Sequence, residues 1–198
     1  MAEVGLRERK KQRTHDTIVQ VAIEQFSERG YQATTVADIA AAAEVAPSTV
    51  FAYFATKEDI VFAGWEPFQT SFRERIEDRP AGESAIEALR DWALRTIPAL
   101  LGAPTDEMLT LRRIIDSDER LLAVERSRMG YFEDVLTREV ARDLNTSPDA
   151  ALTRIVASAV AGALGAILSD SRQAEPAELE RQISLVFAFV ESGLAAIT

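Results

Sequence analysis

Apolar residues recur at intervals of three and four along most of the chain, and this spacing constrains the fold more than any other feature. Ile18, Ala22 and Phe26 illustrate it near the start, and Ile183 and Phe187 near the end. Such spacing lines one face of an α-helix, whereas a half-buried strand needs alternation, which no run of this sequence sustains. The chain is therefore expected to be all-α.

Capping residues, glycines and prolines divide this pattern into about nine predicted helices. The first is expected over about residues 10–29, with Gly30 at its C-terminal cap. Thr35 and Thr56 are each followed three residues later by Asp, which predicts a capping box at the start of the second and fourth helices. The fourth helix is expected to continue without a break to Phe72 and beyond.

Residues 35–57, TVADIAAAAEVAPSTVFAYFATK, hold two short helical patterns joined at EVAP. The second begins at Pro47, whose fixed φ suits a first helical position. Its predicted inner face holds Val50, Phe51 and Phe54, and its predicted outer face holds Ser48, Thr49, Ala52 and Tyr53. A compact helix followed by a short one with a polar outer face is typical of a helix-turn-helix, whose second helix enters the major groove of DNA.

The charge is distributed unevenly along the chain. The net charge is −10, yet residues 1–57 hold seven cations and seven carboxylates, so the whole excess lies in residues 58–198. The first 13 residues are basic because of Arg7, Arg9, Lys10, Lys11 and Arg13. We interpret them as a flexible arm that contacts DNA phosphates or the minor groove. The alternative is a disordered solubilising tail.

Residues 13–61 resemble the N-terminal domain of TetR-type transcriptional regulators. The similarity rests on the Phe-x-x-x-Gly-Tyr turn, the Thr-Val-x-x-Ile-Ala helix and the aromatic-x-Tyr-Phe-x-Thr-Lys close. The resemblance implies that Ser48, Thr49 and Tyr53 face DNA, with Thr35 and Lys57 on phosphates. The partner it implies is double-stranded operator DNA.

This sequence departs from the family's pattern at three positions. Glu44 occupies a turn position where glycine is frequent, and Ala46 replaces a Ser-type N-cap. Phe51 stands where tyrosine is common, so a phenolic phosphate contact is missing there. No predicted outward residue of the third helix is Arg, Lys, Asn or Gln, so modest base discrimination is expected.

Beyond a DNA-binding domain of residues 1–57, residues 58–198 are expected to form a helical body. In TetR-like proteins this part binds a small effector and dimerises through its last two helices. Small residues in the first of these helices and the apolar face of the second suit burial against another copy, although both helices could be internal core. The predicted dimer interface is Leu152, Val156, Val160, Ala161, Leu164, Ile183, Phe187, Val190 and Leu194.

Aromatic and flexible side chains of the middle helices are the candidate walls of an effector pocket. They are Trp65, Phe68, Phe72, Trp92, Leu101, Met108, Leu111, Ile115, Met129, Phe132 and Leu136. The same side chains could instead fill the core completely. The pocket interpretation favours a hydrophobic or amphipathic effector.

The sequence offers little for catalysis. It has no cysteine and a single histidine, His15, beside the basic segment, so we expect no catalytic residues, no metal site and no cofactor. The longest uncharged run, Ile155–Ser169, is shorter than the roughly 20 residues of a membrane span. A cytoplasmic protein without a membrane partner is expected.

These observations favour a homodimeric repressor that a small effector releases from a near-palindromic operator. The first alternative is a ligand-dependent activator or co-repressed regulator, which the sequence cannot separate from a repressor. The second is a helical ligand-binding protein or enzyme with a vestigial head.

Overall fold

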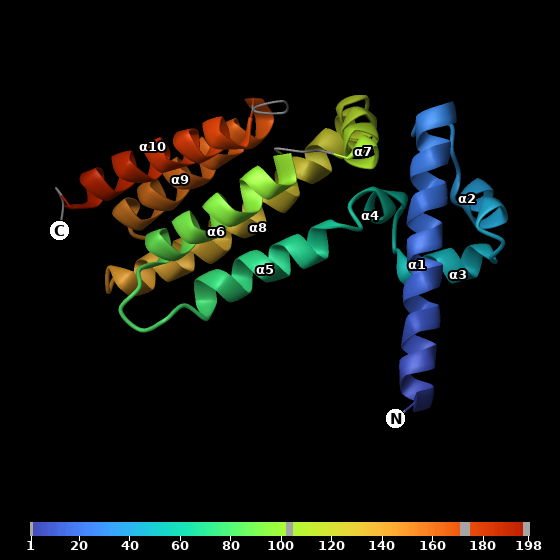
Figure 1. Ribbon diagram of the computed structural model, residues 1–198, viewed down its shortest axis with the longest axis horizontal. Coiled ribbons are helices and arrows are strands. Elements are labelled where there is room, and N and C mark those ends of the chain that lie inside the picture. Colours follow the sequence, from blue (N-terminus) through green and yellow to red (C-terminus); the bar gives the residue numbers. More distant parts are fainter. Residues whose placement is uncertain (1, 102–104, 171–174, 196–198) are drawn as a thin grey trace. The chain divides into compact units, whose positions relative to one another are not determined.

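The computed structural model describes residues 2–101, 105–170 and 175–195, and all regular elements in these ranges are α-helices (Figure 1). They are α1 (Ala2–Arg29), α2 (Val36–Ala42), α3 (Pro47–Tyr53), α4 (Lys57–Val61), α5 (Trp65–Glu77), α6 (Ala85–Leu101), α7 (Asp106–Asp116), α8 (Glu119–Asp143), α9 (Ala151–Asp170) and α10 (Pro176–Ala195). The all-α prediction is confirmed, with one helix more than expected in the described ranges.

The additional helix arises because the predicted fourth helix is interrupted. α4 ends at Val61, and a turn follows in which the backbone N–H of Trp65 donates to the carbonyl of Phe62 at 3.0 Å. Phe62 is buried in this turn, so the apolar pattern continues across the break. Gly64, a weak helix former, lies within the same turn. Periodicity alone could not reveal the interruption.

Residues 1–65 and 105–125 form one compact unit, and residues 66–104 and 126–198 form a second. In the first unit, Ile60 of α4, Ile115 of α7 and Leu121 of α8 join the buried cluster that contains Ile18 and Phe26 of α1. The unit thus extends beyond the expected DNA-binding domain of residues 1–57. A segment distant in sequence supplies part of its core, which contiguous sequence could not show.

Asp118 ties the start of α8 to the loop after α1 within the first unit. Its carboxylate accepts hydrogen bonds from the backbone N–H of Arg120 at 2.9 Å and of Leu121 at 3.3 Å. It also accepts one from the side-chain amide of Gln32 at 2.5 Å. Burial alone would raise the pKa of Asp118, but these hydrogen bonds, that of Gln32 foremost, lower it below its ordinary value.

The second unit is a bundle of α5, α6, α9, α10 and most of α8, in which α10 packs against α6 and α9 (Figure 1). Phe68, Phe72, Trp92 and Phe132 make edge-to-face contacts with ring centroids 4.8–5.5 Å apart. Such pairs add to the stabilisation that burial of their area provides. These rings form the aromatic centre of the bundle.

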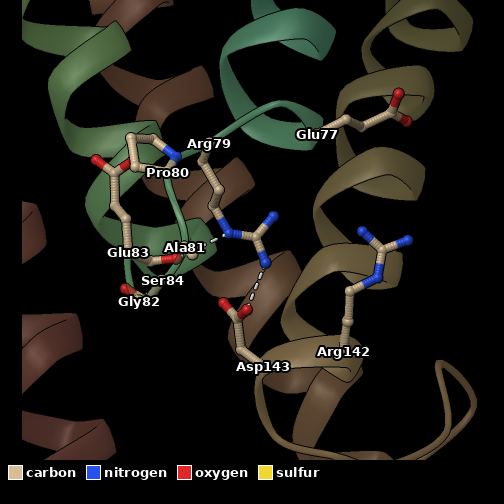
Figure 2. Close-up of a pocket in the computed structure, with 9 residues that line it drawn as sticks. All are labelled: Glu77, Arg79, Pro80, Ala81, Gly82, Glu83, Ser84, Arg142 and Asp143. Atoms are coloured by element: carbon tan, nitrogen blue, oxygen red, sulfur yellow. Dashed lines mark hydrogen bonds and ion pairs between the residues drawn. The ribbon is translucent and has the colours of Figure 1, made fainter.

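Arg79 joins the loop between α5 and α6 to α8. Its guanidinium pairs with Glu139 at 2.7 Å and also with Asp143, toward which it points in Figure 2. The side chains of Arg79 and Glu139 are only 8% and 3% exposed. A buried ion of this kind is stable only while it is paired, because an isolated charge loses its hydration.

Candidate nucleic-acid interface

Both ends of helix α2 carry hydrogen-bonding motifs that pair its free backbone groups. The motif at its C-terminal end sets the direction of the following turn. The hydroxyl of Thr35 accepts from the N–H of Asp38 at 3.1 Å, and the Asp38 carboxylate accepts from the N–H of Thr35 at 2.9 Å. At the other end, the N–H of Val45 donates to the carbonyl of Ala40 at 2.9 Å. The N–H of Glu44 donates to Ala41. The first pair confirms the predicted capping box, and the second is a Schellman motif.

Glu44 adopts φ 55°, which is the left-handed conformation expected at a turn position where the family frequently has glycine. Such a conformation costs a residue with a side chain roughly 1–2 kcal/mol. Ala46 precedes α3 and makes no side-chain cap, as expected from the missing Ser-type residue. The turn is therefore held by its own backbone hydrogen bonds and by the packing of the two helices.

Helix α3 is anchored by Val50 and Phe54, which are 1% and 5% exposed. The prediction that Phe51 also faces the core was wrong, because its side chain is 55% exposed. Val50 of α3 and Phe54, the C-cap residue four positions later, both point inward, and Phe51, the residue after Val50, is turned away from the core. Phe51 therefore lies on the solvent face.

The exposed surface of α3 contains Pro47, Ser48, Phe51 and Ala52, with Thr49 and Tyr53 half-buried beside them. The ring of Tyr53 lies 6.3 Å from that of His15 in α1, and His15 lies 5.0 Å from the ring of Phe54. His15 thus supports the edge of α3 that carries Tyr53. Ser48, Thr49 and Tyr53 stand on or at the margin of one solvent face, as a surface that reads DNA requires; their DNA contacts stay a prediction.

Lys57, predicted to contact a phosphate, has a structural role in this unit. Its ammonium donates to the carbonyl of Tyr31 at 2.7 Å and to that of Thr34 at 3.0 Å. It also lies 4.0 Å from the centroid of the Tyr31 ring, within cation–π distance. Burial lowers the pKa of Lys57. These contacts fasten the start of α4 to the loop before α2, and the phosphate contacts of Lys57 and Thr35 stay predictions.

The basic segment is part of α1 rather than a flexible arm. α1 already begins at Ala2, and the five cations from Arg7 to Arg13 are all exposed. Arg9 donates from Nε to the carbonyl of Gly5 at 3.0 Å, an interaction within one helical turn. Arg7, Lys10 and Lys11 are spaced by three and four residues, which places them on one side of the helix. The segment presents an ordered positive surface.

Most residues of the predicted dimer interface are buried within the protomer, and their part in a dimer stays a prediction. Val156, Val160, Leu164, Ile183, Phe187 and Val190 are buried within the protomer, while Leu152, Ala161 and Leu194 are half-buried. The strict three-four spacing marks the stripe that packs inside the bundle, so these six residues are core. The large apolar side chains exposed on the described parts of α9 and α10 are instead Ile155, Leu185 and Phe189.

The predicted pocket residues are divided between the two compact units. Trp65, Leu111 and Ile115 pack in or against the core of the first unit, and Met108 lies on α7 of that unit. The others belong to the second unit: Phe68, Phe72, Trp92, Leu101, Met129, Phe132 and Leu136. The four aromatic rings among them contact one another as core side chains do. An effector pocket among these residues stays a prediction.

Two hollows described in the second unit are lined by charged residues. One of about 460 Å³ lies beside Arg79 and Arg142 (Figure 2), and one of about 530 Å³ lies beside Arg75 and Arg95. Arg75 is already paired with Glu83 at 2.5 Å and with Asp91 at 2.8 Å. Neither hollow includes a predicted pocket residue, and their polarity does not suit an apolar effector.

Comparison with known proteins supports the interpretation of the helix-turn-helix. A family profile described as "Bacterial regulatory proteins, tetR family" matches residues 18–63. The chain is 30% identical over 192 residues to MftR of Mycobacterium tuberculosis, named as a mycofactocin biosynthesis transcriptional regulator, and the match covers 94% of this chain and 93% of MftR. It is 36% identical over 146 residues to the HTH-type transcriptional regulator TcmR of Streptomyces glaucescens, covering 69% of this chain and 63% of TcmR.

Solved structures show the same fold. NalD of Pseudomonas aeruginosa, the secondary repressor of the MexAB-OprM multidrug efflux pump, superimposes with a TM-score of 0.64 at 21% identity, covering 89% of this chain and 96% of NalD. SmeT in complex with triclosan gives 0.63 at 20% identity, covering 91% of this chain and 90% of SmeT. With the capped α2, the left-handed turn and the outward face of α3, these similarities show that the chain is a DNA-binding transcriptional regulator of the TetR family.

Proposed function

We propose that this protein is a homodimeric repressor that a small hydrophobic or amphipathic effector releases from a near-palindromic operator. The observation that carries the proposal is the placement of α3, which is anchored by the buried Val50 and by Phe54 at its C-cap while Pro47, Ser48, Phe51 and Ala52 are exposed. A helix held in this way can enter the major groove without losing contacts to its own core. Ser48, Thr49 and Tyr53 are its proposed polar contacts.

Phosphate contacts would come from two regions of the first unit. The exposed cations of α1 provide an ordered positive surface, which contributes affinity that falls steeply with salt. Thr35 and Lys57 each stand at the start of a short helix, where backbone N–H groups also favour an anion. The acidic excess of residues 58–198 contrasts with the basic first 13 residues, which supply the cationic surface of α1.

A second copy would cover the exposed apolar faces of α9 and α10. Ile155, Leu185 and Phe189 are 65%, 57% and 79% exposed, which is costly for side chains of this size in water. Ala159, Gly162 and Ala166 continue the exposed face of α9 with small residues that permit close approach of helices. Residues 151–168 of α9 are long and apolar enough to cross a membrane. Only 28% of this stretch is buried within the protomer, so most of this apolar stretch is not covered by the protomer itself. A symmetric dimer would bury this surface.

The effector proposal rests on the aromatic side chains of the second unit. Phe68 is half-buried while Phe72, Trp92 and Phe132 are buried, so an apolar molecule could reach this cluster beside Phe68 with a modest rearrangement of its rings. SmeT, which shares the fold, holds triclosan, a small hydrophobic compound. To release DNA, an effector must bind the state that does not fit the operator better than the state that does.

The test of the proposed function is selection of bound duplexes from a random DNA pool by the purified full chain, at about 150 mM salt so that non-specific phosphate binding is suppressed. The expected result is an enriched inverted repeat whose half-sites lie about one helical turn apart. Absence of enrichment after the protein is unfolded, stripped of bound compounds and refolded would refute the proposal.

Two variants give the selection a structural control. Ser48→Asp places a carboxylate on the exposed face of α3. It should abolish binding to the selected operator, because the negative charge of this carboxylate would be repelled by the phosphates and would face the base edges. Ala123→Asp places the same charge on an exposed position of α8 and should bind as the wild type does. A reporter gene behind the operator then separates a repressor from an activator by the sign of the response.

A further inference from the structure

Phe51 is an exposed aromatic residue at the centre of the proposed DNA-reading surface. Among the residues described in the first unit, the large apolar side chains that are exposed are Leu6, Phe51 and Leu109. Of these, Phe51 alone lies on α3. Leaving a phenylalanine in water forgoes the stabilisation that its burial would provide. Its position suggests that a ligand of this helix covers it.

The neighbours of Phe51 define the chemistry of the surface. Pro47 and Ser48 lie four and three residues before it and share its side of the helix, and Ala52 follows it, all of them exposed. This face carries one hydroxyl among apolar groups, and no side chain of α3 is Arg, Lys, Asn or Gln. The bidentate hydrogen bonds that identify guanine or adenine in the major groove are therefore not available from it.

One feature of the major groove matches such a surface. Thymine exposes its 5-methyl group there, and apolar side chains recognise it by contact. Phosphate contacts need a donor, which the phenylalanine ring lacks. A ring that stands out from α3 while the helix lies in the major groove would face base edges, and the methyl group is the apolar group among them.

We propose that Phe51 determines specificity by packing against the 5-methyl group of a thymine in each operator half-site. This inference rests on the proposed function, because it requires α3 to enter the major groove. It assigns base selection to an apolar contact, in addition to the polar contacts of Ser48 and Thr49. The preferred operator should accordingly contain a fixed thymine in each half.

The test replaces single thymines of the selected operator by deoxyuridine, which keeps base pairing and removes only the methyl group. At one symmetric pair of positions the wild-type protein should bind the deoxyuridine duplex about 15-fold more weakly, which corresponds to about fourfold for each buried methyl group. Phe51→Ala should bind the thymine and deoxyuridine duplexes equally. Leu109→Ala, a control for loss of an exposed apolar side chain in the same unit, should keep the full discrimination.

Each outcome decides the matter. If the wild type binds every deoxyuridine duplex as tightly as the thymine duplex, or if Phe51→Ala keeps the wild-type discrimination, Phe51 does not read thymine. The wild-type comparison needs no variant, so it holds even if Phe51→Ala proves unstable. Failure of the random pool to yield any inverted repeat would refute the proposed function, and with it this inference, whereas a repeat bound without methyl discrimination refutes the inference alone.

Discussion

Two phenylalanines of α10, only two residues apart, should have opposite effects when they are truncated to alanine. Phe187 is 0% exposed and Phe189 is 79% exposed. Because successive helical residues are rotated by about 100°, residues two apart point to nearly opposite sides of the helix. Phe187→Ala should therefore destabilise the protomer, and Phe189→Ala should weaken the dimer.

The expected magnitudes follow from the two exposures. Complete burial of a phenylalanine is worth about 1.5–3 kcal/mol, and about four-fifths of Phe189 is still available for burial in a dimer. A symmetric interface loses two copies, so Phe189→Ala should cost about 2.4–4.7 kcal/mol of dimerisation free energy, or about 60- to 3,000-fold in the dimer Kd. Phe187→Ala leaves a cavity in the bundle and should cost about 3–5 kcal/mol of unfolding free energy.

Sedimentation velocity over a dilution series measures the dimer Kd, and urea unfolding followed by circular dichroism at one protein concentration measures stability. Full helical signal of the Phe189→Ala monomer at low denaturant would show that the variant is folded. A dimer Kd within twofold of the wild-type value would refute the assignment of this face to the interface. An unchanged urea midpoint for Phe187→Ala would contradict the burial of its ring.

Three further predictions concern the charged contacts. Arg79→Ala should lower the unfolding free energy by about 3–5 kcal/mol because it leaves the buried Glu139 without this partner. Arg142→Ala removes an exposed partner of the same carboxylate and should cost under about 1 kcal/mol. Equal urea midpoints for the two variants would contradict this prediction. Lys57→Met should lower the unfolding free energy by about 2–4 kcal/mol, because two hydrogen bonds to backbone carbonyls are lost. If the predicted phosphate contact of Lys57 exists, the same variant should also reduce the slope of log Kd for DNA against log salt by about 0.9. Since its hydrogen bonds lower the pKa of Asp118, its stabilisation should be complete above about pH 4 and lost as the pH falls through the folded-state pKa; Asp118→Asn should flatten this acid limb in urea titrations.

The DNA-binding region could be predicted well because its signals are local. Capping boxes at Thr35 and Thr56, the left-handed Glu44 and the start of α3 at Pro47 depend on residues within one or two turns. Each is readable because the backbone groups at a helix end must find partners nearby. Phe51 was misplaced because a seven-residue helix shows too few apolar positions to define its inner face.

The boundary of the first unit could not be read in the same way. Ile115 and Leu121 follow Phe54 by some 60 residues, yet they belong to the same buried cluster. Nothing in their local spacing says which core they join. Gln32 and Asp118 are likewise distant in sequence, and only the fold makes their hydrogen bond visible.

By itself, the sequence determined the helical class, the helix-turn-helix and its caps, because these follow from periodicity and from hydrogen bonds between near neighbours. The tertiary structure alone decided which side of α9 and α10 is interior. Both helices carry apolar residues beyond one stripe, and spacing places Phe187 but not Phe189 on the main stripe of α10; it could not say whether that stripe faces the protomer's own core or a partner. Packing of α10 against α6 and α9 buries one side of α10 within the protomer, and the side that remains exposed is the one available to a partner.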